Sequence, residues 1–335
     1  MKQIISKIKN GEELIESEVK EIVESIEKNT FNKEEMKEFL LAMNEKKITS
    51  NELYFFVNEL YKKANKIDLG EDLIDVCGTG GDNTHTFNIS TACMFVTAGA
   101  GVKIAKHGNK AVSSKSGSFD VLEELGININ DCSNKAKETL EKTNIALLFA
   151  PMHHPVFKNI GEVRRELGQK TMFNLMGPLL NPCNVKKQLI GVYDENITEL
   201  IANTMQKKGI TSGLVVNGNG LDEITIDGKT KITELKNNEI KTYYITPEQF
   251  KIKSSKISEL IVNSKEESAK LIISILNNEE SSAKDIVVLN SGAAIYLSGK
   301  ANSIEEGIVK AQESIKTGAA SNILNKLREI LKKEE

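Results

Sequence analysis

The chain has 335 residues, of which 39% are hydrophobic and 27% are charged, and its formal net charge is −3 at pH 7. This composition is that of a folded globular protein, and the length allows one large domain or two ordinary ones. The slightly acidic balance and the absence of a long basic run argue against a protein whose main partner is a nucleic-acid backbone.

The cysteines and the N-terminal segment indicate the cellular compartment. The four cysteines are scattered without a CxxC pair, which argues against a zinc site and against a disulfide framework. The first twenty residues alternate charged and apolar side chains and lack the apolar core of a signal peptide. No stretch approaches the ~20 apolar residues that span a membrane. We therefore expect a cytoplasmic protein with no membrane partner.

Residues 1–65 predict a small helical domain. Apolar residues recur at helical spacing in four successive segments, for example at Val19, Ile22, Val23 and Ile26. Residues 49–52, TSNE, match a capping box that opens the last of these helices. We expect the apolar faces of the four helices to pack against one another.

From residue 73 onward the pattern changes to that of an α/β domain. Short apolar runs with helical patterns between most of them predict a mostly parallel central sheet covered on both faces. Residues 221–245 alternate polar and apolar side chains and predict a strand-rich excursion. A capping-box start at 303–306, a break at Gly318 and a final charged helix close the chain. The predicted strands are residues 73–76, 102–105, 145–149, 189–192, 213–216 and 286–289.

A glycine loop follows the first predicted strand. Residues 75–91, DVCGTGGDNTHTFNIST, join that strand to a predicted helix, so the loop should lie at the carboxyl edge of a parallel sheet, where ligands bind. Glycines let the backbone approach an anion closely, and the free N–H groups at the start of the helix favour phosphate. The loop therefore predicts a phosphate site.

Two familiar phosphate-binding patterns do not fit this loop. The Walker pattern needs Gly-Lys-Ser/Thr, but Gly81 is followed by Asp82. The dinucleotide pattern G-x-G-x-x-G begins at Gly78, but Asn83 occupies its third glycine position. Neither an NTPase nor a dehydrogenase is favoured.

The polar residues of the loop suit a phosphorylated sugar. The acid Asp82 could bind ribose hydroxyls or water on a bound metal, and Thr86, Asn88, Ser90 and Thr91 offer hydroxyls and an amide. A purely structural alternative is a glycine turn in which Asn88 or Ser90 caps the following helix. The loop alone does not decide between the two interpretations.

A second polar segment, residues 106–120, follows the second predicted strand. Lys106 offers a positive charge for phosphate, and His107 and Asn109 offer directional hydrogen bonds. A hydroxyl-rich stretch then leads into a helix with Ser113, Ser114, Gly117 and Ser118. This stretch could be only a capped loop, but two such segments after adjacent strands favour a binding site.

Two later segments offer further charged groups. Arg164, on a predicted helix, could grip a planar carboxylate through two parallel hydrogen bonds, although an ordinary surface charge is the alternative. Asp222 and Glu223 follow a glycine turn, and adjacent acids of this kind bind divalent cations beside phosphates or are simply solvated. His153 and His154 are neighbours in sequence, which argues against a shared metal site.

Taken in order, these motifs resemble the anthranilate phosphoribosyltransferase family over nearly the whole chain. The resemblance rests on GTGGD and TFNIST in residues 78–91, KHGN at 106–109, VRRELG through NP in 163–182, and DEIT at 222–225. It implies a small helical domain (residues 1–65, joined by part of 155–180) and an α/β catalytic domain (70–335) of the nucleoside phosphorylase/phosphoribosyltransferase type. It also implies a homodimer that transfers phosphoribose from 5-phosphoribosyl-1-pyrophosphate (PRPP) to anthranilate in tryptophan biosynthesis.

The resemblance assigns a role to each matching position. Ser90, Asp222 and Glu223 would bind two Mg²⁺ ions on the pyrophosphate. Gly78, Asn109 and Arg164 would contact anthranilate, with His107 and His154 beside its path. No catalytic base is assigned, because an aromatic amine is already a free base at neutral pH. The positions that would bind PRPP are Gly78, Gly81, Asp82, Thr86, Asn88, Ile89, Ser90, Thr91, Lys106, His107, Gly108, Asn109, Lys110, Ala111, Val112, Ser113, Ser114 and Ser118.

The sequence departs from the family at a few positions, and two related families are alternatives. Lys110 and Lys170 stand where arginine is frequent, and lysine keeps the charge but loses the forked geometry. Cys77 stands where an aliphatic residue is common. Pyrimidine nucleoside phosphorylases have a similar lysine–histidine segment but carry an additional C-terminal domain. A nucleic-acid-binding relative of the same fold would be expected to be basic and to have a degraded glycine loop or acid pair.

Overall fold

The computed structural model describes residues 1–111 and 116–332, and it begins with four amphipathic helices. The predicted capping box opens the fourth helix: the Thr49 hydroxyl accepts from the Glu52 backbone N–H, and the Glu52 carboxylate accepts from that of Thr49. The buried faces are those that the apolar spacing predicts, including Val19, Ile22 and Val23 on the second helix. The four helices are α1 (Lys2–Lys9), α2 (Glu16–Glu27), α3 (Lys33–Lys46) and α4 (Ser50–Lys62).

A seven-stranded sheet follows, in the order β3-β2-β1-β4-β5-β6-β7. The first five strands along the chain are parallel, and β6 and β7 form an antiparallel hairpin at one edge. The mostly parallel sheet and the strand-rich excursion within 221–245 are therefore confirmed. The strands are β1 (Ile74–Gly78), β2 (Ile104–Gly108), β3 (Ile145–Phe149), β4 (Lys187–Gly191), β5 (Ser212–Asn217), β6 (Thr230–Lys236) and β7 (Glu239–Ile245).

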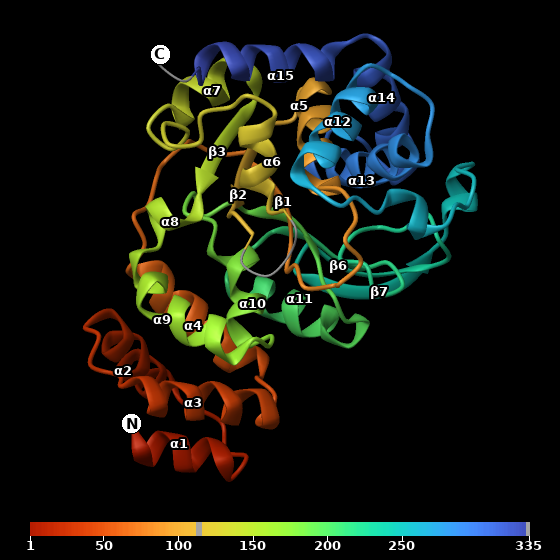
Figure 1. Ribbon diagram of the computed structural model, residues 1–335. Coiled ribbons are helices and arrows are strands. Elements are labelled where there is room, and N and C mark those ends of the chain that lie inside the picture. Colours follow the sequence, from red (N-terminus) through yellow and green to blue (C-terminus); the bar gives the residue numbers. More distant parts are fainter. Residues whose placement is uncertain (112–115, 333–335) are drawn as a thin grey trace.

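Helices cover both faces of this sheet (Figure 1). One face packs against α5 (Ile89–Gly99) and α13 (Ser282–Ser298), which are in turn covered by α14 (Ile304–Lys316) and α15 (Ala319–Ile330). On the other face, α11 (Thr198–Lys207) packs on β5 and β6, and α7 (Ala136–Thr143) packs on β3. The remaining helices are α6 (Ser118–Glu124), α8 (Ala150–His153), α9 (Lys158–Leu167), α10 (Met172–Met176) and α12 (Lys265–Leu276), with short 3₁₀ turns at 155–157, 177–180, 195–197, 247–250 and 257–260.

The strand predicted at residues 286–289 is wrong, because this segment lies inside α13. Ser281 caps that helix by accepting from the Lys284 backbone N–H, and Gly299 ends it with φ of 88°. The helix is buried on nearly all sides between α5 and α14. A helix without a polar face shows no helical period, so its apolar run cannot be told from a buried strand.

The second predicted strand is also displaced. It runs from Ile104 to Gly108 and not from 102 to 105, so Lys106 and His107 are strand residues. Successive side chains of a strand point to opposite faces. Lys106 therefore points toward α5 and His107 toward the opposite face of the sheet, which places the two groups in different surroundings.

The N-terminal helices share a hydrophobic core with the second face of the sheet. This cluster runs from Ile22 and Phe56 in the N-terminal helices through Ile160 in α9 and Phe173 in α10 to Ile190 in β4. In Figure 1 the four helices lie at the end of the molecule opposite α15, with α9 and α10 beside them. Within the described residues, no helix is both long and apolar enough to cross a membrane.

Candidate active site

The glycine loop leaves β1 in a conformation that most residues do not adopt. Gly80, Gly81, Asn83 and His85 have φ of 65°, 77°, 60° and 57°, four left-handed residues within six positions. Glycine adopts this region without strain, and asparagine and histidine do so more readily than most residues. The loop is closed by Asp82, whose carboxylate accepts from the Thr84 backbone N–H at 3.2 Å and its hydroxyl at 2.6 Å.

The loop around Asp222 lies directly on two glycines that end neighbouring strands. Gly78 of β1 and Gly191 of β4 are paired in register, and the Gly80 N–H donates to Oδ2 of Asp222 at 2.7 Å. A Cβ at Gly78 would lie 2.2 Å from Oδ2 of Asp222, and a Cβ at Gly191 would lie 1.5 Å from the Asp222 carbonyl oxygen. Only glycine at both positions lets Asp222 reach the glycine loop, although Asp222 and Gly80 are 142 positions apart in sequence.

Three carboxylates converge at this point: Asp82, Asp222 and Glu223. Burial, together with the negative charge of Asp82, raises the pKa of Asp222 well above its ordinary value. Burial and the neighbouring Asp222 raise the pKa of Glu223, and this rise is opposed by Lys106. Buried carboxylates that lie close together repel one another when they are ionised, so such a cluster favours either protonation or a bound cation.

Lys106 holds the other side of the acid cluster. Its side chain is 1% exposed, and its Nζ donates to the Val76 carbonyl at 2.5 Å and to Oγ of Ser90 at 2.9 Å. These two bonds leave one of its three N–H groups for another acceptor. Lys106 thus places a fixed positive charge beneath the helix start at Ser90 and beside Glu223.

The capping alternative for Asn88 and Ser90 is not what the structure shows. The Asn88 side chain does not cap the N-terminus of α5. Oδ1 of Asn88 accepts from the hydroxyls of Ser116 and Ser268, and Ser90 accepts from Lys106. The backbone at Thr86 pairs with Ile261, while Ile89 and Thr91 are buried in α5. The N–H groups at this helix start already have acceptors, because Asn88 donates to the Ser268 hydroxyl and both Ile89 and Thr91 donate to backbone carbonyls. The positive potential that an anion would meet here therefore comes from Lys106 and from the helix dipole.

The second polar segment begins at the exposed end of β2. Asn109 and Lys110 are exposed, and Nζ of Lys110 pairs with Glu123 at 2.7 Å. Asp120 accepts from the backbone N–H groups of Ala111 and Gly117, which holds the two ends of this segment together. Gly108 and Ser118 lie beside each other, because a Cβ at Gly108 would be 2.5 Å from Oγ of Ser118. The predicted positions Val112, Ser113 and Ser114 lie outside the described residues.

The histidines occupy the opposite face of β2. His107 is buried, and burial lowers its pKa well below the ordinary range, so the ring is neutral. Among the described residues its Nε2 has no hydrogen-bond partner. Its ring contacts the edge of His154, whose Nε2 bonds to the Leu180 carbonyl at 2.8 Å and whose pKa burial lowers to about 4. Two neutral rings therefore line this face, and neither is arranged as a strong base.

Arg164 lies in the last turn of α9. It is partly buried, and Nη2 approaches Oδ1 of Asn174 at 3.4 Å while the guanidinium lies over the Phe173 ring. Burial lowers its pKa from the ordinary value of arginine. No carboxylate within the described residues forms an ion pair with it. The guanidinium is held by a neutral amide and a ring, which suits an anionic ligand.

The sequence-based prediction missed a buried acid beneath the site. Asp75 is fully buried in β1 and accepts from the Asn181 side chain at 2.9 Å and from the His107 backbone N–H at 3.4 Å. Burial raises its pKa to about 6. The sequence signal for it was an acid inside an apolar strand segment, because burying an acid costs free energy unless the group is hydrogen-bonded. Asp75 holds β2 and the segment at Asn181 in place.

The donor set at the acid cluster fits a hard divalent cation that shares its ligands with phosphate. Among the described residues no three His, Cys, Asp or Glu side chains are grouped to hold a metal by themselves. Asp222, Glu223 and the Ser90 hydroxyl are oxygen donors, and Mg²⁺ is commonly held by one or two carboxylates with substrate phosphates completing the shell. The residues present therefore suit Mg²⁺ that arrives with a phosphorylated ligand.

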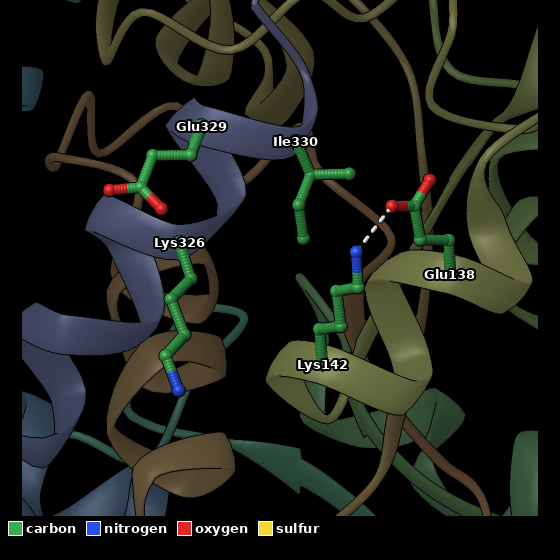
Figure 2. Close-up of a pocket in the computed structure, with 5 residues that line it drawn as sticks. All are labelled: Glu138, Lys142, Lys326, Glu329 and Ile330. Atoms are coloured by element: carbon green, nitrogen blue, oxygen red, sulfur yellow. Dashed lines mark hydrogen bonds and ion pairs between the residues drawn. The ribbon is translucent and has the colours of Figure 1, made fainter.

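A surface groove elsewhere contributes none of the predicted residues. It lies between α7 and α15 and is lined by Glu138, Lys142, Lys326, Glu329 and Ile330 (Figure 2). Lys142 pairs with Glu138 at 2.7 Å. The groove carries exposed charges of both signs, whereas the glycine loop gathers buried acids and a buried lysine. The glycine loop is therefore the stronger candidate for the active site.

The chain is similar to known proteins along nearly its whole length. A family model described as "Glycosyl transferase family, a/b domain" matches residues 70–321. An anthranilate phosphoribosyltransferase of Acetivibrio thermocellus is 44% identical over 333 residues, which cover 99% of this chain and 96% of that protein.

Two solved structures are similar along most of the chain. Anthranilate phosphoribosyltransferase from Thermus thermophilus has a TM-score of 0.91 at 32% identity and covers 98% of both chains. The enzyme from Saccharomyces cerevisiae, solved in complex with PRPP and Mg, has a TM-score of 0.81 at 27% identity, covering 89% of this chain and 85% of that one.

Proposed function

The chain belongs to the anthranilate phosphoribosyltransferase family, and from this premise we propose how its residues carry out the reaction. The enzyme transfers phosphoribose from PRPP to the amine of anthranilate, giving N-(5-phosphoribosyl)anthranilate and pyrophosphate. The observation that carries the proposal is the convergence of Asp82, Asp222 and Glu223 with buried Lys106 on the glycine loop.

PRPP would lie along the carboxyl edge of β1, β2 and β4. The left-handed glycine loop lets phosphate approach the backbone at Gly81 closely, and the start of α5 with Lys106 beneath it adds positive charge. Asp82 lies at the acid end of the loop, so we place it beside the ribose and pyrophosphate and not at the 5-phosphate. The segment from Lys106 to Ser118 would enclose the remaining phosphate.

Mg²⁺ would be held by Ser90, Asp222 and Glu223 together with pyrophosphate oxygens, and we propose two ions. The bound metal would neutralise charge on the pyrophosphate as it leaves. The protein supplies the buried carboxylates, whose pKa values are raised without metal. A bound cation would take the place of the proton and keep them ionised. The Gly80 N–H holds Asp222 in place for this role.

Anthranilate would lie between the sheet edge and α9. Arg164 offers a forked donor to its carboxylate, and Asn109 and Gly78 line the approach to the ribose carbon. The neutral rings of His107 and His154 would line one side of this path. Positioning is the main contribution of these residues, because holding two reactants in line can supply a large part of the rate enhancement.

No protein base is required for the displacement. The anthranilate nitrogen forms the new bond to C1 of the ribose, the C1–O bond breaks, and its electron pair leaves on the pyrophosphate. The amine then loses a proton to solvent. Lys106 and the loop N–H groups stabilise the negative charge that builds on the leaving oxygens.

We further propose that residues 1–65 with part of 155–180 form a domain that moves relative to residues 70–335. The shared packing of the N-terminal helices with α9 and α10 supports this division. Closure would bring Arg164 toward the sheet edge and exclude water that could hydrolyse PRPP. A homodimer and a cytoplasmic location are part of the same proposal.

Anthranilate fluorescence tests the function directly. Purified protein with PRPP and Mg²⁺ should consume anthranilate, and omission of Mg²⁺ should abolish the signal change. Alanine at both Asp222 and Glu223 should abolish turnover without unfolding, whereas Glu138→Gln, in the groove between α7 and α15, should leave it unchanged. Near-normal activity of the double variant would contradict the metal assignment, and phosphorolysis of pyrimidine nucleosides without anthranilate consumption would contradict the function.

A further inference from the structure

Lys170 reaches across the boundary between the N-terminal helices and the sheet. It lies between α9 and α10, and its side chain crosses the glycine loop: a Cβ at Gly81 would be 3.0 Å from Cε of Lys170. Its Nζ lies 3.7 Å from the centroid of the Tyr193 ring. Its backbone carbonyl accepts from the Asn44 side chain of α3 at 2.7 Å.

Tyr193 presents its ring at the edge of the same site. It comes two residues after β4, the strand that pairs with β1, and the Thr79 N–H donates to the Gly191 carbonyl at 2.9 Å where the two strands end. The ring is half-buried. The ammonium of Lys170 thus lies between an aromatic ring and the glycine loop.

The contact between the Lys170 ammonium and the Tyr193 ring is weak enough for an anionic ligand to replace it. Among the residues that the structure describes, Lys170 forms no ion pair with any carboxylate. A cation held by an aromatic face is bound less strongly than one that donates charge-assisted hydrogen bonds to phosphate oxygens. The lysine stem is flexible, so the ammonium can leave the ring while Cε stays over Gly81.

The position along the glycine loop identifies the partner. Gly81 lies between Asp82 and Gly80, and Gly80 donates to Asp222, so Lys170 stands at the acid end of the loop. Under the proposed function this end holds the metal-bound pyrophosphate, and the ribose 5-phosphate lies elsewhere. The anion within reach of Lys170 is therefore the leaving group.

We propose that Lys170 is a pyrophosphate-binding residue, resting on the proposed function, and that its ammonium exchanges the Tyr193 ring for the pyrophosphate of bound PRPP. The positive charge of Lys170 stabilises the negative charge that develops as the C1–O bond breaks. Because Asn44 anchors the same residue to α3, binding of pyrophosphate also draws the N-terminal helices toward the sheet edge.

Binding of inorganic pyrophosphate with Mg²⁺, measured by titration calorimetry, tests this directly. Lys170→Met should weaken pyrophosphate binding and raise the KM for PRPP by roughly tenfold each, with the KM for anthranilate unchanged. Lys170→Arg should retain both values within about threefold, because it keeps the charge. Lys229→Met, which removes a lysine from the Tyr244 ring outside the site, is the matched control and should change neither.

The Tyr193 ring is tested separately. Tyr193→Phe should change little, because the ring remains, and Tyr193→Leu should tighten pyrophosphate binding by about threefold, because the ammonium no longer has to leave a partner. Weaker pyrophosphate binding in Tyr193→Leu would overturn the exchange. Unchanged pyrophosphate binding in Lys170→Met, with an unchanged thermal midpoint to show that the variant is folded, would overturn the role of Lys170.

Failure of the proposed function would be seen differently. In that case the unaltered chain would not consume anthranilate with PRPP and Mg²⁺, whatever the variants do. If the unaltered chain is active and Lys170→Met binds pyrophosphate normally, only the inference about Lys170 is overturned.

Discussion

Gly191→Ala should disable the site while leaving most of the fold intact. A Cβ at position 191 would lie 1.5 Å from the Asp222 carbonyl oxygen, and real Cβ contacts essentially never fall below 3.0 Å. The Asp222 backbone would therefore have to retreat by at least about 1.5 Å, because a packed interior has no free space to absorb an added methyl group. A displacement of ~1 Å at a reacting centre costs about 10²-fold in rate.

The expected result is a fall in kcat of about 10²-fold or more, with a stability cost of ~1–3 kcal/mol from overpacking. Anthranilate fluorescence measures the first quantity, and urea unfolding measures the second. Gly161→Ala in α9 is the matched control, since its nearest atom would be Nη1 of Arg165 at 3.6 Å, an ordinary contact. That variant should keep its activity and gain ~0.5–1 kcal/mol of stability. If Gly191→Ala keeps kcat within about twofold of the parent, the packing of Asp222 on the strand ends is not what positions the metal site.

Three other predictions concern charge. Lys46→Met leaves the Glu52 carboxylate, which is fully buried, without its cation, so urea unfolding should show a loss of ~3–5 kcal/mol; a loss below ~1 kcal/mol would contradict a buried ion pair. Arg164→Ala should raise the KM for anthranilate at least ~10-fold with little change in that for PRPP, and an unchanged KM would remove Arg164 from the acceptor site. Folding raises the pKa values of Asp222 and Glu223, so the folded state binds their protons more tightly than the unfolded state does. Without metal, the free energy of unfolding should therefore fall as the pH rises from the unfolded pKa values through the folded pKa values. PRPP with Mg²⁺ should therefore raise the thermal midpoint more at about pH 9 than at about pH 6, and an equal rise at both would show that the acids do not bind the metal.

Local patterns were sufficient for most of the fold. The four N-terminal helices follow from apolar residues at helical spacing and from the capping box at Thr49, both of which depend only on residues a few positions apart. The first five strands were found near their observed positions for the same reason. The strand predicted at 286–289 was wrong because α13 is buried on nearly all sides, so its apolar residues show no helical period.

The sequence by itself determined the residue types of the site and their order: a glycine loop, a lysine–histidine segment, an arginine and an acid pair, which together identify the family. Only the tertiary structure decided which of these groups meet. It placed Lys106 and His107 on opposite faces of one strand and brought Asp222 onto the glycines that end two neighbouring strands. It also placed the side chain of Lys170, which lies between α9 and α10, over Gly81 and against the Tyr193 ring. The physical reason is that these contacts join residues far apart in the chain, and they exist only where strand pairing and helix packing bring those residues together, which no local pattern encodes.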